Sequence, residues 1–152
     1  MKINETGRSM IEMLAVLAII GVITVSALSG YSQAMMRYKT SKTVTEVITI
    51  ADEVFKLYSW KRTYPTEEID CKTFVDEGII GEKAQNGTYI CNNPFGGKYA
   101  VKANNSNKKC LDITVEGLPE DACKQIEDEI WSGLSLCNKP ACSGKSITIS
   151  VE

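Results

Sequence analysis

The sequence lacks histidine altogether among its 152 residues. A serine–histidine–aspartate triad, a histidine-ligated metal and an imidazole acid or base are therefore excluded in this chain. An excess of one charge is lacking as well. Because only Lys2, Glu5, Arg8 and Glu12 precede Gly30, the remainder carries 15 Lys and Arg against 17 Asp and Glu. This near balance argues against a general nucleic-acid-binding surface, and we expect no nucleic acid as a partner.

Charge is also missing from one long segment. Between Glu12 and Arg37 lie 24 uncharged positions, most of them apolar. At about 1.5 Å of rise per residue, a helix of this length crosses a hydrocarbon core of roughly 30 Å. Glu12 stands at the front of the run, and an acidic residue at mid-bilayer costs about 2.5–3.5 kcal/mol. Either Glu12 lies shallow, among the lipid headgroups, or a cation compensates it.

A short polar leader, residues 1–7, precedes the apolar run and ends in Gly7. It is unlike a secretory signal peptide, because no apolar stretch comes before Gly7. The combination of Gly7, Glu12 five residues later and an unbroken apolar helix resembles the class III signal of type IV pilins and of the related pseudopilins of type II secretion. The resemblance implies that a prepilin peptidase cuts between Gly7 and Arg8 on the cytoplasmic side. Members usually carry Phe or Met after the glycine, so Arg8 departs from the pattern and its N-methylation stays open.

Glu12 then acquires an expected role in assembly. Cleavage would expose an α-amino group on Arg8, four residues from Glu12. In an array of helices, Glu12 of an incoming subunit can pair with the terminal ammonium of its neighbour. Burying the pair replaces two costly lone charges and sets the axial register between subunits.

The same helix is predicted to continue beyond the membrane. Residues 8–30 form its transmembrane, assembly half, and residues 31–62 an amphipathic half that ends before Pro65. Steps of three and four predict one buried stripe in the second half. The stripe comprises Tyr31, Ala34, Met35, Tyr38, Val44, Val47, Ile48, Ala51, Val54, Phe55 and Tyr58. A helix of about 50 residues is roughly 75 Å long, so half of it must find lipid or other copies of itself.

Residues 63–152 are predicted to form a compact head. Alternating apolar residues and turn signals predict strands at 88–91, 98–103, 111–115 and 146–151. Capping and stop signals predict a short helix at 70–78 and a second one from Pro119 to about residue 133. Residues 93–97, 113–119 and 122–123 resemble the head of type IVb-like pilins. The expected fold is therefore α+β, a pilin fold in which the long helix lies on an antiparallel sheet of three or four strands.

Six cysteines lie beyond the apolar run: Cys71, Cys91, Cys110, Cys123, Cys137 and Cys142. An even set predicts up to three disulfides and an oxidising compartment. A zinc site is the competing account, but the chain has neither a Cys-x-x-Cys pair nor a histidine. Many pairings are possible. The one that we expect joins Cys71 to Cys91, Cys110 to Cys137 and Cys123 to Cys142.

These features predict a structural subunit of a bacterial type IV pilus of the type IVb-like kind, with no enzyme activity, cofactor or metal. The resemblance implies other copies of the chain, a prepilin peptidase, an assembly ATPase and a platform protein as partners. It also implies an inner-membrane precursor with a periplasmic head, and then an extracellular filament. A type II secretion pseudopilin or a minor pilin is the alternative within the family. A monomeric periplasmic binding domain on an uncleaved membrane anchor is the alternative outside it.

Overall fold

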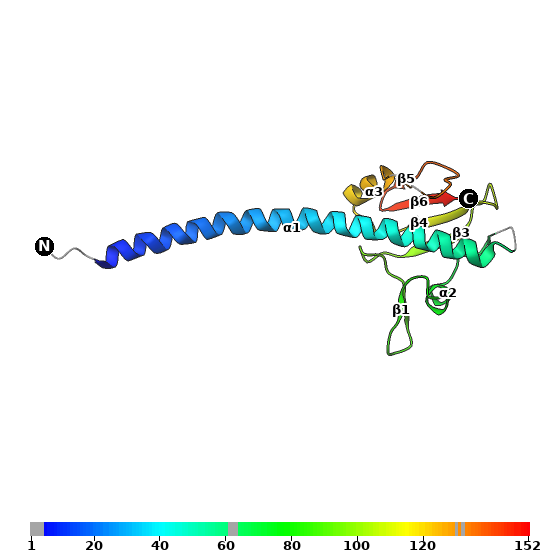
Figure 1. Cartoon of the computed structure of the whole chain (residues 1–152), viewed down its shortest axis with the longest axis horizontal. Coiled ribbons are helices and arrows are strands. Elements are labelled where there is room, and N and C mark those ends of the chain that lie inside the picture. The colour runs from blue at the N-terminus through cyan, green and yellow to red at the C-terminus, as the bar shows by residue number, and fades with distance from the viewer. Residues whose placement is uncertain (1–4, 61–63, 130, 132) are drawn as a thin grey trace. The chain divides into compact units, whose positions relative to one another are not determined.

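A computed structural model of the chain describes residues 5–60, 64–129, 131 and 133–152, with side chains from Met10 onward. The chain divides into two compact units, Met1–Arg37 and Tyr38–Glu152, and we call the second the head unit. The first helix, α1 (Glu5–Tyr58), supplies the described residues of the first unit and the first element of the head unit (Figure 1).

The main sheet of the head unit has four antiparallel strands in the order β3-β4-β6-β5. The strands are β3 (Tyr99–Ala103), β4 (Leu111–Val115), β5 (Ala141–Ser143) and β6 (Ser146–Val151). The register places Ile113 of β4 opposite both Val101 of β3 and Ile149 of β6. Since side chains alternate between the two faces of a sheet, this register gathers the apolar residues of three strands on one face.

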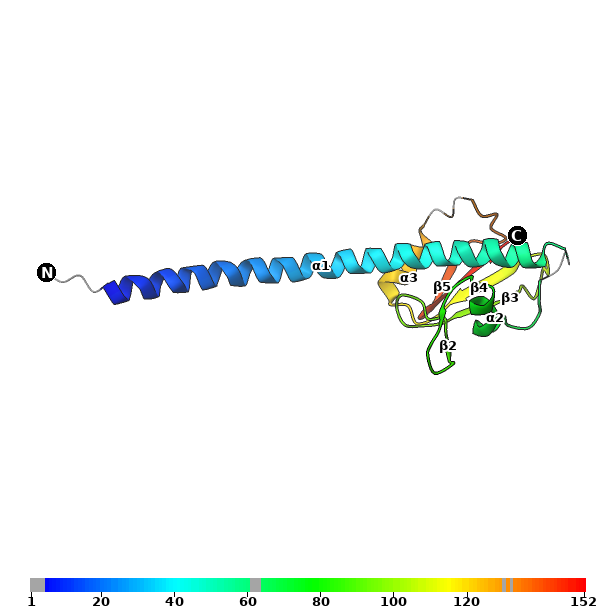
Figure 2. The same cartoon turned by 60° about the horizontal axis from the view of Figure 1, so that its bottom comes forward.

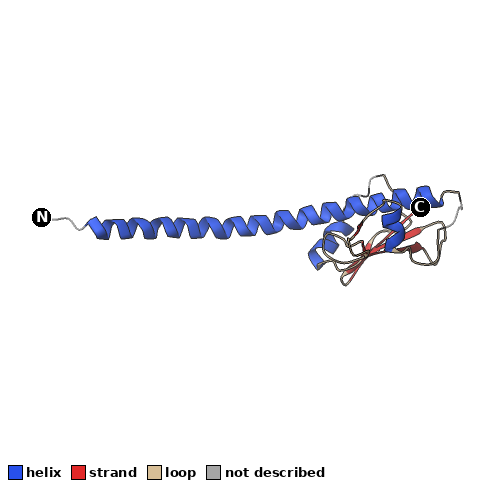
Figure 3. Ribbon diagram, turned by 90° about the horizontal axis from the view of Figure 1, so that it is seen from below, coloured by secondary structure: helices blue, strands red, loops and turns tan. Residues whose placement is uncertain are grey.

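That apolar face packs against α1 (Figure 3). Val47, Ile50 and Val54 of α1 are fully buried in one cluster with the strands. The strand residues in this cluster are Tyr99, Val101, Leu111, Ile113, Val115, Ile147, Ile149 and Val151. The α+β architecture predicted from the sequence, with the long helix lying on a small antiparallel sheet, is thus confirmed.

The fourth strand of this sheet is not the one that the sequence predicts. The expected strand at 88–91 is reduced to β2 (Tyr89–Ile90), which pairs with β1 (Glu82–Lys83) in a separate two-stranded sheet. Figure 2 shows β2 beside α2, apart from the main sheet. The turn at Gly87, whose φ is 86°, returns the chain locally, so 88–91 pairs with its own neighbours. The fourth place goes to β5, which is too short to show an alternating pattern.

The two short helices also differ in part from expectation. Helix α2 (Cys71–Asp76) follows Asp70 as predicted, although the Asp70 side chain makes no capping hydrogen bond. Helix α3 (Glu120–Glu127) ends well before residue 133. At 100° per residue, a continued helix would turn Trp131 about 140° away from the buried Ile126. Because the chain leaves the helix, Trp131 can also reach the core, where it is buried.

Three disulfides join the six cysteines of the head unit. They are Cys71–Cys91, Cys110–Cys137 and Cys123–Cys142, with Cα–Cα distances of 5.7, 6.3 and 6.0 Å. These are the pairs expected from the sequence. The first fastens the start of α2 to the residue after β2, and the third fastens α3 to β5. Each closes a loop of about 20–30 residues, and such crosslinks typically contribute about 3 kcal/mol each to stability.

A polar contact links α1 to the sheet at the edge of this core. The Tyr99 hydroxyl donates a hydrogen bond of 2.6 Å to the Glu46 carboxylate. Burial, and secondly this hydrogen bond, raise the pKa of Tyr99 well above its usual value. The folded head unit therefore keeps the phenol protonated at a pH at which an unfolded chain releases the proton.

This shift predicts an alkaline loss of stability. Above about pH 10 the unfolded chain binds fewer protons than the folded one, so the free energy of unfolding falls as the pH rises. We expect the wild type to lose about 1 kcal/mol more than Tyr99→Phe between pH 10 and 11. Thermal unfolding of both chains in detergent micelles, followed by near-ultraviolet circular dichroism, measures the difference. Equal slopes for the two chains would contradict the prediction.

Candidate functional site

The apolar run of α1 presents its side chains to the surroundings on every side. The large apolar residues from Met10 to Leu28 are 52–70% exposed. They are Met10, Ile11, Met13, Leu14, Val16, Leu17, Ile19, Ile20, Val22, Ile23, Val25 and Leu28. Because this surface surrounds the helix rather than forming one stripe, packing on a single partner could not cover it. By length and composition, α1 can cross a membrane.

Two hydroxyl groups within this run are satisfied by the helix itself. Thr24 Oγ1 donates to the carbonyl of Ile20 at 2.8 Å, and Ser26 Oγ donates to the carbonyl of Val22 at 3.0 Å. A hydroxyl that hydrogen-bonds its own helix can be placed in hydrocarbon at a lower cost than one without a partner. These polar residues are therefore compatible with a lipid or helix-bundle environment.

The sequence-predicted assembly and cleavage residues all lie near the start of α1. Glu12 is exposed and lies within the apolar surface, between Ile11 and Met13. Gly7 and Arg8 belong to the helical backbone of α1, but the side chain of Arg8 lies outside the described part of the chain. Cleavage after Gly7 and pairing of Glu12 with a neighbouring chain remain predictions.

The second half of α1 carries the predicted buried stripe, with corrections. Val47, Ala51 and Val54 are buried as expected. Four residues of the predicted stripe are instead exposed: Tyr31, Ala34, Tyr38 and Phe55. Phe55 lies 100° round the helix from Val54, on the side that leaves the core. The stripe instead includes residues that the prediction missed. These are Thr40, Thr43 and Ile50. Together with Val47 and Val54 they follow one another in steps of three and four, a pattern that could have revealed them.

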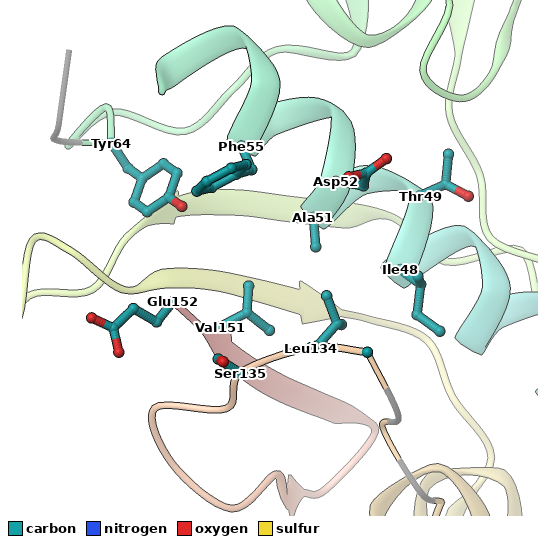
Figure 4. A pocket seen from close by; sticks show the side chains of 11 residues that line it. Ile48, Thr49, Ala51, Asp52, Phe55, Tyr64, Leu134, Ser135, Val151 and Glu152 are labelled. Carbon is teal, nitrogen blue, oxygen red and sulfur yellow. The ribbon is translucent and has the colours of Figure 1, made fainter. Parts of the chain in front are cut away.

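A cavity of about 410 Å³ lies beside the exposed edge of this stripe. Figure 4 shows its walls: α1 on one side, and the segment 133–135 with the end of β6 on the other. We call it the α1 groove. It is lined by Ile48, Thr49, Ala51, Asp52, Phe55, Tyr64, Gly133, Leu134, Ser135, Val151 and Glu152. Because these residues come from distant parts of the sequence, no local pattern could have predicted the groove.

A known protein family matches most of the head unit. The family model described as "PilS N terminal" matches residues 37–143. The chain belongs to this family, which is related to the type IV pilins. No curated protein and no solved structure matches the chain.

The family-model match and the resemblance seen in the sequence depend mainly on different parts of this PilS-family chain. The resemblance came chiefly from Gly7, Glu12 and the apolar run, all of which precede residue 37. The match begins at residue 37, immediately before the head unit, and ends at residue 143, the last residue of β5. Membership in a pilin-related family is thus supported from both ends, and it indicates a structural rather than a catalytic protein.

Proposed function

We propose that the chain is a structural subunit of a bacterial type IV pilus and that it polymerises through α1. Family membership makes it a pilus-related subunit, and the type IVb-like kind is our proposal from the sequence of the head. The exposed apolar surface from Met10 to Leu28 carries the proposal. A chain with such a surface needs lipid around it or other copies against it, and a pilus subunit has each in turn.

The maturation pathway belongs to the same proposal. A prepilin peptidase removes residues 1–7, residues 8–30 form the assembly half of α1, and residues 31–62 connect them to the disulfide-bonded head, 63–152. Before assembly the chain is held in the inner membrane with its head in the periplasm. The three disulfides support this placement, because disulfides form and persist in oxidising compartments. An assembly ATPase and a platform protein complete the machinery.

Intact mass and filament shearing test the proposal together. We expect the membrane-extracted chain to have lost residues 1–7, with any N-methylation of Arg8 adding the mass of one methylene group. We also expect the chain to be a main component of the filaments sheared from the cells. A retained leader, with no chain in the sheared fraction, would overturn the proposal in favour of a monomeric anchored domain. A cleaved chain that stays with the cells would point to a pseudopilin instead.

A further inference from the structure

The α1 groove leaves apolar surface uncovered in the head unit. Phe55 on its wall is 53% exposed, and Ile48, Tyr64 and Leu134 are only partly buried. Figure 4 shows the rings of Phe55 and Tyr64 next to each other at one end of the groove. The lining also bears two carboxylates, Glu152 and Asp52, of which Asp52 forms a salt bridge of 2.8 Å with Lys56. The groove therefore combines an apolar wall with negative charge.

A complementary feature lies just beyond α1. Trp60 is 93% exposed, so it does not fill the groove of its own chain. It is followed in the sequence by two cations, Lys61 and Arg62. Tryptophan and arginine are the residues most enriched at the energetic centres of protein interfaces. The segment at Trp60, an apolar ring followed by positive charge, is thus complementary to the α1 groove, an apolar wall with carboxylates.

We propose that the α1 groove receives Trp60 of a second copy of this chain, an inference that rests on the proposed pilus function. The helix residues of the groove centre on Ala51 and Asp52, eight or nine positions before Trp60. At about 1.5 Å per residue, this separation is roughly 12 Å along the helix. A parallel copy displaced by that distance brings its Trp60 level with the groove.

The contact joins two different surfaces of the same chain. Each copy offers its own groove to one neighbour and its own Trp60 to another. A head-to-tail contact of this type produces an open helical filament when its rotation does not close a ring. The groove therefore supplies a contact between heads in addition to the apolar assembly through residues 8–30.

Photo-crosslinking in the assembled filament tests the contact directly. Trp60 is replaced by the photoreactive residue p-benzoylphenylalanine in the full chain, the sheared filaments are irradiated, and the crosslinked peptides are identified by mass spectrometry. We expect chain-to-chain crosslinks from position 60 to residues 48–55 or 133–135. The same probe at Tyr38, another exposed aromatic residue of α1, is the control and should not crosslink to the groove.

The outcomes separate this inference from the proposed function. Filaments that form but crosslink from position 60 to another surface, to lipid, to a different protein or to nothing would overturn the inference and leave the pilus function standing. The absence of this chain from the sheared fraction of wild-type cells would overturn both.

A pair of charge reversals tests the electrostatic part. Asp52 and Glu53 each lie 2.8 Å from Lys56 Nζ, and their side chains are 59% and 40% exposed, but only Asp52 lines the groove. We expect Asp52→Lys to lower the yield of the crosslink about fivefold, and Glu53→Lys to leave it unchanged. Equal effects of the two reversals would contradict a role for the charge of the groove.

Discussion

Replacing Glu12 with valine is expected to leave the chain in the membrane and to abolish its assembly into filaments. Valine lowers the cost of membrane insertion, because it removes a carboxylate from the apolar run. In the filament, however, the substitution takes away the proposed partner of the ammonium group on Arg8 of the neighbouring chain. Breaking a buried ion pair by removing one partner costs about 3–5 kcal/mol, so filament yield should fall at least about 100-fold.

Thr24→Val is the matched control for this experiment. It removes a polar group from the same apolar run, but the Thr24 hydroxyl bonds the carbonyl of Ile20 in its own helix. Assembly should therefore persist in this variant. The measurements are the amount of chain in the membrane, its intact mass and its amount in the sheared fraction. Near-normal filaments from a correctly processed Glu12→Val chain would refute the assembly role of Glu12.

Replacing Gly97 with alanine is expected to destabilise the head unit by about 3 kcal/mol. A Cβ atom on Gly97 would overlap the carbonyl oxygen of Glu116, which is backbone and cannot simply turn away. Asn93 holds these segments together. Its Nδ2 donates to the Glu116 carbonyl at 2.6 Å, and its Oδ1 accepts from the Gly97 N–H at 3.0 Å. The added methyl group therefore pushes apart two segments that the hydrogen bonds of the buried Asn93 side chain hold together.

The neighbouring Gly96 provides the control, because its backbone conformation favours glycine whereas the space around it does not require one. Its φ is 88°, yet a Cβ atom there would meet no other atom within 4 Å. Gly96→Ala should cost only about 1 kcal/mol, from backbone strain alone. Thermal unfolding of the full chain in detergent, followed by near-ultraviolet circular dichroism, reports on the head unit, because every aromatic residue except Tyr31 lies there. If Gly97→Ala lowered the free energy of unfolding no more than Gly96→Ala does, the proposed steric overlap at Gly97 would be refuted.

The corrections to the predicted fold have a common cause. The strands 98–103, 111–115 and 146–151 were predicted because alternating apolar residues are a local pattern, and each closely matches a strand of the main sheet. Strand β5 has only three residues, and its place depends on pairing with β6 after the turn at Gly144. The end of α3 likewise depends on the burial of Trp131, a contact with the core rather than a property of the helix itself.

The features of the candidate sites likewise divide into those that a local sequence pattern predicts and those that depend on distant contacts. The sequence alone was enough to predict the apolar run, the unusual position of Glu12 and the membrane-capable helix, because these depend on adjacent residues and on the cost of charge in hydrocarbon. The periodicity of α1 also predicted part of its buried face, Val47, Ala51 and Val54, whereas the tertiary structure decided how the fourth strand is supplied and where the α1 groove lies. Those features need segments up to about a hundred residues apart to meet, and contacts of that range leave no periodic trace in the sequence.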